Sequence, residues 1–135
     1  MLIKKITYTD YNGEERTEEF YFSLNKAEII RMNMSKRGGM EEYIKRMIAE
    51  NDPEKLTIMF EELILLGYGI KSEDGRKFVK SKELSEDFKN TAAYAELFIE
   101  LTSDTNAIIN FLVGMLPADI GAEVSKMDLK SLPSV

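Results

Sequence analysis

The sequence predicts an α+β fold that is mainly α-helical, with an N-terminal β-hairpin followed by about five to six helices. Two alternating stretches, residues 2–10 and 15–22, flank a turn that contains Asn12 and Gly13. After residue 25, apolar residues recur three and four positions apart between capping residues, which is typical of amphipathic helices. We expect one domain over residues 1–117 and a flexible tail over 118–135, where helical periodicity fades.

The turn of the hairpin decides which side chains share a face. A two-residue loop would pair Ile6 with Glu19 and divide the apolar residues between opposite faces. A type I turn that begins at Asp10 and places Gly13 fourth, in the left-handed region, gives a three-residue bulged loop. One face then carries Leu2, Ile6, Tyr8, Phe20 and Phe22. Because an isolated hairpin is marginally stable, this face must pack on the helices or on another chain.

Capping residues mark where the helices begin. Asn25 and Glu28 form a capping box, and Asp52 precedes Pro53 at a natural first helical position. Gly67 stands where a helix-terminating glycine is expected. The predicted helices cover residues 25–34, about 40–50, 53–66, 82–89 and 91–101, and a last one capped by Ser103 or Asp104 and ended by Pro117. The turn-rich segment 67–81 can hold a second small hairpin around residues 74–75.

The last predicted helix is apolar almost all round. Such a helix is either buried on both sides or buried on one side and covered by a partner on the other. Eight methionines leave a similar choice between an irregular core and an adaptable binding surface. We expect a partner or oligomer interface at Ile108, Phe111, Leu112, Met115, Phe20 and Phe22.

Composition excludes several kinds of chemistry. The net charge of −6 argues against nonspecific nucleic-acid binding, which needs a basic surface. The chain has no cysteine and no histidine, so thiol nucleophiles, zinc–thiolate sites and the commonest general base are absent. No signal peptide and no membrane-spanning apolar stretch is expected.

Short motifs point to no catalytic, cofactor or metal site. "GYGIKS" lacks the third glycine of a dinucleotide fingerprint and follows a helix instead of a strand. "SEDG" would place Ile70 where a calcium loop needs its first carboxylate, and a type I turn explains it better. Adjacent glutamates such as Glu61 and Glu62 point to different faces of a helix, so we interpret them as solvated surface residues. A metal-dependent hydrolase or nuclease would need converging carboxylates in a cleft.

Longer stretches carry a more specific resemblance. "ITYTDYNGEERTEEFYFSLNKAEI", "LILLGYGIKSEDGRKFVKSKELSEDFKNTAAYAELFIEL" and "AIINFLVGMLP" resemble the tail assembly chaperones of long-tailed phages and prophages of Gram-positive bacteria. The resemblance covers roughly residues 3–117. It implies a non-enzymatic protein without cofactor or metal that acts in the host bacterial cytoplasm and is absent from the mature virion.

The resemblance also implies the partners. Such chaperones bind the tape measure protein, keep its long helical chain soluble and bring tail tube subunits to polymerise around it. They tend to form homo-oligomers, and neither nucleic acid nor a membrane is an expected partner. The alternative is a structural tail completion or connector protein of the virion with a similar small α+β domain.

Overall fold

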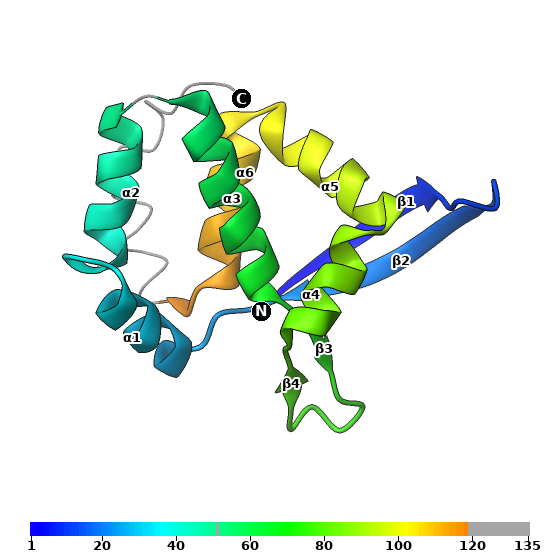
Figure 1. The fold of residues 1–135 in the computed structure, drawn as a ribbon. Helices are drawn as coiled ribbons and strands as arrows, with labels where there is room; N and C mark the ends of the chain where they lie inside the picture. The colour runs from blue at the N-terminus through cyan, green and yellow to red at the C-terminus, as the bar shows by residue number, and fades with distance from the viewer. Residues whose placement is uncertain (51, 119–135) are drawn as a thin grey trace.

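The order of elements follows the predicted α+β arrangement, with the hairpin first and the helices after it (Figure 1). The computed structural model describes residues 1–50 and 52–118, so nearly all of the predicted tail lies outside the described residues. Within them the elements are β1 (Leu2–Thr9), β2 (Glu15–Phe22), α1 (Lys26–Ser35), α2 (Gly39–Glu50), α3 (Pro53–Gly67), β3 (Tyr68–Lys71), β4 (Phe78–Val79), α4 (Lys82–Lys89), α5 (Ala92–Thr102) and α6 (Thr105–Met115).

The first hairpin adopts the predicted bulged register. Leu2 lies opposite Phe22 on the neighbouring strand, so even-numbered residues face even-numbered ones along the whole ladder. At the turn, the Asp10 amide donates to the Glu14 carbonyl at 2.8 Å, and the Gly13 amide donates to the Asp10 carbonyl at 3.0 Å. Gly13 has a φ of +84°, a conformation that glycine adopts without steric cost. The predicted turn is therefore confirmed.

The second predicted hairpin also forms, and it extends the first into one antiparallel sheet. Tyr21 and Phe22 of β2 pair with Gly69 and Tyr68 of β3, and β3 pairs in turn with β4. The strand order is β1-β2-β3-β4. Alternation predicted the first hairpin and turn residues predicted the second, but neither pattern indicated that the two hairpins share a sheet.

The helices pack on the face of the sheet that bears the even-numbered side chains of β1 and β2. In Figure 1, α4 and α5 cross the long hairpin, α3 and α6 lie beside them, and α1 and α2 stand at the far side. Phe22 is fully buried, with its ring centroid 5.8 Å from that of Phe88 and 4.9 Å from that of Phe111. Phe88 also stacks on Tyr68 at 4.3 Å and lies 5.1 Å from Phe20. These contacts join β2, β3, α4 and α6 in one aromatic cluster.

Side chains cap the helices as the sequence predicts. Asn25 and Glu28 exchange both hydrogen bonds of a capping box at the start of α1. Asp52 accepts from the Glu54 amide, and Ser81 accepts from the Leu84 amide. Between the two residues considered for α6, Asp104 is the cap. Each cap satisfies amide donors that have no carbonyl partner within the first helical turn.

Gly67 ends α3 as predicted, but without the left-handed backbone that helix-terminating glycines usually adopt. Gly67 is the last residue of α3, and it is not among the described glycines with positive φ. A Cβ atom at this position would collide with the buried sulfur of Met115. The glycine is needed because α3 and α6 approach each other closely there, and close packing between distant segments leaves no local sequence signal.

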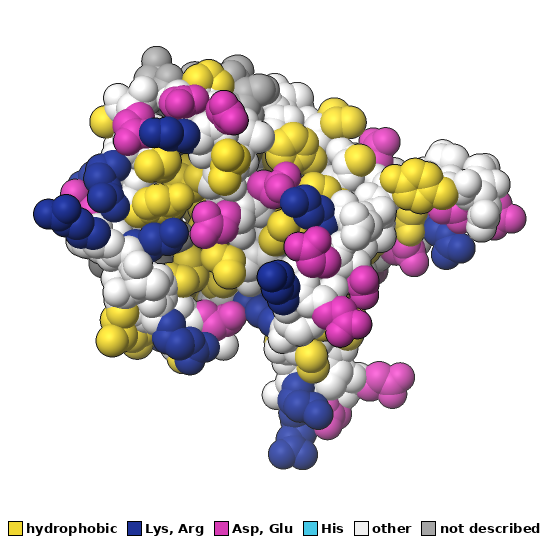
Figure 2. All heavy atoms as spheres, in the orientation of Figure 1, with side chains coloured by type: hydrophobic (Ala, Val, Ile, Leu, Met, Phe, Trp, Pro, Cys, Tyr) yellow, Lys and Arg dark blue, Asp and Glu magenta, His cyan; other side chains and the backbone are white. Residues whose placement is uncertain are grey.

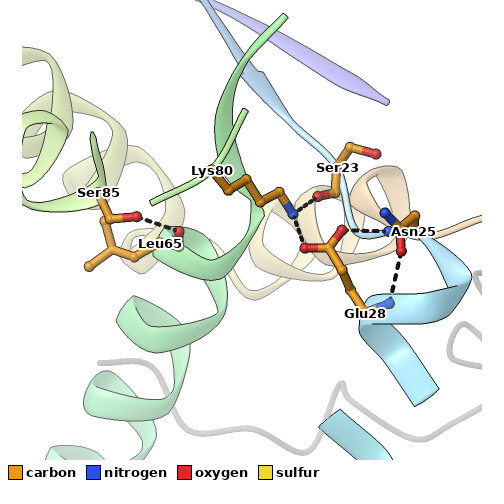
Figure 3. Close-up of polar contacts among 6 residues, drawn as sticks. All are labelled: Ser23, Asn25, Glu28, Leu65, Lys80 and Ser85. Atoms are coloured by element: carbon orange, nitrogen blue, oxygen red, sulfur yellow. Dashed lines mark hydrogen bonds and ion pairs between the residues drawn. The ribbon is translucent and has the colours of Figure 1, made fainter. Parts of the chain in front are cut away.

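The link from β2 to α1 is held by three other parts of the chain. The Ser23 amide donates to the Gly67 carbonyl at 2.8 Å, and the Leu24 amide donates to the Met115 carbonyl at 2.9 Å. Figure 3 shows Lys80, which follows β4, donating to the Ser23 carbonyl and pairing with Glu28 at 2.7 Å. The ends of α3 and α6 and the exit of β4 therefore meet at this link.

The same region closes the end of α3. The Ser85 hydroxyl of α4 donates to the Leu65 carbonyl at 3.2 Å (Figure 3). That carbonyl lies in the last turn of α3, where carbonyl groups lack helical amide partners. The bond therefore satisfies the helix end and also fixes α4 against α3.

Gly67→Ala should destabilise the protein by about 1–3 kcal/mol, because the added methyl group would overpack the contact with Met115. Urea unfolding of the purified chain measures this change. Gly67→Ala should cost less in a Met115→Ala background, since the shorter side chain leaves room for the methyl group. Equal costs in the two backgrounds would show that the helices do not meet in this way.

Asp10→Asn should weaken the hairpin tip and reduce its acid sensitivity. The Arg16 guanidinium, which donates to Asp10 at 2.6 Å, and the amides of Glu14 and Asn12 hold the pKa of this carboxyl below its usual 3.8. Since the folded-state pKa is lowered, the stabilisation is present above pH 3.8 and is lost as the pH falls through the lower value.

The measurement is urea unfolding of both proteins between pH 7 and pH 2. The gap in unfolding free energy between wild type and Asp10→Asn should be largest near neutral pH and should narrow in acid. A gap that stays constant over this range would contradict the assigned role of Asp10.

Candidate protein-interaction surfaces

The six residues predicted to contact partners lie largely inside this chain. Ile108, Phe111, Leu112 and Met115 of α6 are buried in the core, and so is Phe22; Phe20 is partly buried. The apolar remainder of α6 is half-buried at Ile109, Val113 and Leu116. The near-continuous apolar surface of α6 is thus used for packing between α3, α5 and the sheet. Contact of these residues with a partner stays a prediction.

A different set of apolar side chains is exposed on α3. Ile58 is 59% exposed and Leu66 is 41% exposed, and they lie eight residues apart on one side of the helix. Between them, Glu61 pairs with Lys89 of α4 at 3.1 Å, and Glu62 pairs with Lys36 at 3.5 Å. We call the outer side of α3 that carries Ile58, Glu62 and Leu66 the α3 stripe. Sequence periodicity placed Leu66 on the same apolar side as the buried residues of α3, whereas the structure leaves it exposed.

Exposed and half-buried apolar side chains also lie on α1 and α2. Ile30 and Met34 are exposed four residues apart on α1, while Tyr43 and Met47 of α2 are half-buried. The Lys36 ammonium lies 4.3 Å from the centre of the Tyr43 ring and also pairs with Glu62, so Tyr43 of α2 lies near the middle of α3. Figure 2 shows hydrophobic side chains gathered over α2 and α3, with charged groups around them. This arrangement is common at protein–protein contact sites.

The sheet presents a second exposed surface. Its outer face, opposite the helices, carries the odd-numbered residues of β1 and β2. Ile3 is 53% exposed there, and Lys5 lies opposite Glu19 on the neighbouring strand. Thr7 and Thr17 share a hydrogen bond at 2.9 Å further along. The outer face of the hairpin is therefore mainly polar, with one apolar end.

Titratable groups in the described ranges 1–50 and 52–118 include adjacent carboxylates and tyrosines with raised pKa values. The adjacent carboxylates Glu61 and Glu62 point to different neighbours, as their spacing predicts. Described residues include no group of three acidic, histidine or cysteine side chains able to hold a metal ion. A hydrogen bond to Glu18 raises the pKa of Tyr8, and burial raises the pKa of Tyr94. Neither shift brings a proton donor or acceptor toward neutral pH.

The described residues present exposed apolar side chains close to ion pairs, and surfaces of this kind bind other proteins. None of the helices within the described ranges is long and apolar enough to cross a bilayer. Comparison with known proteins agrees with a role in assembly. A family model described as phage tail assembly chaperone matches residues 1–133, whereas no curated protein and no solved structure matches the chain. The chain belongs to the phage tail assembly chaperone family.

Proposed function

We propose that this chaperone binds the tape measure protein, keeps its long helical chain soluble and recruits tail tube subunits to it. It would do so in the host bacterial cytoplasm as a non-enzymatic, self-associating protein that does not remain in the mature virion. The family match over residues 1–133 supports a role in tail assembly. The finer assignment of partners rests on the sequence resemblance and on the surfaces that the fold leaves exposed.

The single observation that carries the proposal is the α3 stripe beside α1 and α2. A long helical client presents apolar ridges with i, i+3 and i+4 spacing, which pack against apolar surface on another helix. Ile58 and Leu66 supply such surface, and Met34 on α1 adds a flexible thioether side chain that adapts to varied partners. Glu62, which pairs with Lys36, lies between Ile58 and Leu66, and Glu61 pairs with Lys89; these charges among the apolar side chains limit self-aggregation.

Ile58→Asp combined with Leu66→Asp should reduce binding of the tape measure protein. Co-expression of the two proteins in a bacterial host should leave less of the client in the soluble fraction than wild-type chaperone does. The reason is that a carboxylate placed in an apolar contact must be desolvated without a partner. The amount of client that co-purifies with tagged chaperone gives a second readout.

A matched control is available on the β3–β4 hairpin. Ile70 is 48% exposed, and Val79 lies opposite it in the ladder, so Ile70→Asp with Val79→Asp adds the same charge to another exposed apolar pair. Both double variants should remain folded, since substitutions at exposed positions usually change stability by less than about 0.5 kcal/mol each. Equal loss of client binding in the two double variants would argue against the α3 stripe.

Purified mature virions should contain no stoichiometric amount of this chain, whereas assembly intermediates should contain it together with the tape measure protein. Quantitative mass spectrometry of both fractions measures this. Retention of the chain at a fixed copy number in finished particles would replace the chaperone assignment with that of a structural tail component.

A further inference from the structure

The outer face of the β1–β2 hairpin has a regular arrangement of side chains that the proposed client contact does not use. Three cross-strand pairs follow one another along it: Ile3 with Tyr21, Lys5 with Glu19, and Thr7 with Thr17. The first pair is apolar or aromatic, the second joins opposite charges, and the third is polar and neutral. The helices cover the other face, to which Phe22 and Ile6 point.

The apolar end of this face is larger than the first pair alone. Tyr21 lies beside Gly69 of β3, and the Phe78 ring occupies the space over that glycine, where a Cβ atom would come within 2.7 Å of it. Ile3 is 53% exposed, and Tyr21 and Phe78 are half-buried. A sheet face with apolar side chains at its surface gains stability when another layer covers it.

The arrangement is complementary to itself. A twofold axis between two stacked hairpins, running along the strands and between β1 and β2, would place each side chain over its cross-strand partner in the other copy. Ile3 would then face Tyr21, Lys5 would face Glu19, and Thr7 would face Thr17. Sheets that stack face to face keep their strands nearly aligned, which preserves this correspondence between rows.

The charges favour a second copy over a partner of uniform charge. Lys5 and Glu19 are adjacent and opposite in sign, so a surface of single sign would always meet one like charge. A copy of the same face satisfies both. We propose that the outer face of the β1–β2 hairpin, at Ile3, Tyr21, Lys5 and Glu19, is a twofold contact between two copies of this chain.

This inference deepens the self-association part of the proposed function, and the test uses the purified chain without any client. Lys5→Glu and Glu19→Lys each break the charge pairing, so either variant alone should dimerise at least about tenfold more weakly than wild type in low-salt sedimentation equilibrium. A mixture of the two variants should form mixed dimers with an affinity close to that of wild type. Native mass spectrometry with one variant isotope-labelled identifies the mixed species.

The mixing experiment distinguishes contact between copies from contact within one copy. Each variant carries two like charges at positions 5 and 19, and the two variants carry opposite signs there, so recovery in the mixture requires these positions of one copy to meet those of the other. Ile3→Glu should also weaken the dimer, while Ile70→Glu, at an apolar residue exposed on the other face, should not. Both positions are exposed, so folding is retained.

Wild-type protein that is still monomeric at about 0.1 mM would overturn the proposal, because specific contacts of standard size have dissociation constants below this concentration. Failure of the mixed variants to recover dimerisation would also overturn it. Client binding is tested separately from dimer formation. A variant that is monomeric but still keeps the tape measure protein soluble would show only that client binding does not require the dimer.

Discussion

Burial of Phe22 and Phe88 against each other is the contact on which the rest of the fold depends. Phe22 ends β2 and Phe88 lies on α4, so their packing fixes the helices to one face of the sheet. Tyr68 extends the cluster to β3, and Phe111 extends it to α6. Truncation of a buried phenylalanine to alanine typically costs about 3–5 kcal/mol, a large part of the stability of one small domain.

The aromatic cluster also determines which surfaces remain free. Because Phe22 points toward the helices, the period of two along β2 turns Glu19 and Tyr21 to the outer face. Because α6 fills the space between α3 and the sheet, its apolar residues serve the core, and exposed apolar area falls instead on the outer side of α3. A tail assembly chaperone needs surface that is free to bind, and among the described residues this packing leaves exposed apolar side chains on α3 and on the outer face of the sheet.

Local chemistry explains why so many boundaries could be predicted. Capping at Asn25, Asp52 and Ser81 and the turn at Asp10 each involve residues within four positions of one another, so their signals are complete in the sequence. The role of Gly67 could not be predicted in the same way, because the atom that requires it belongs to Met115, far along the chain. The partner surface could not be predicted for a similar reason. The apolar sequence of α6 is compatible both with burial inside its own chain and with coverage by a partner.

The sequence by itself determined the α+β class, the bulged register of the first hairpin, the helix starts and the resemblance that the family match confirms. These properties depend on short-range hydrogen bonds, on side-chain periodicity and on long characteristic strings. Only the tertiary structure decided that β3 joins β2, that Ser23, Lys80 and Glu28 meet beside the start of α1, and that Ile58 and Leu66 remain exposed. Those features arise where segments distant in sequence compete for the same core, and the outcome depends on shape and volume that no local pattern records.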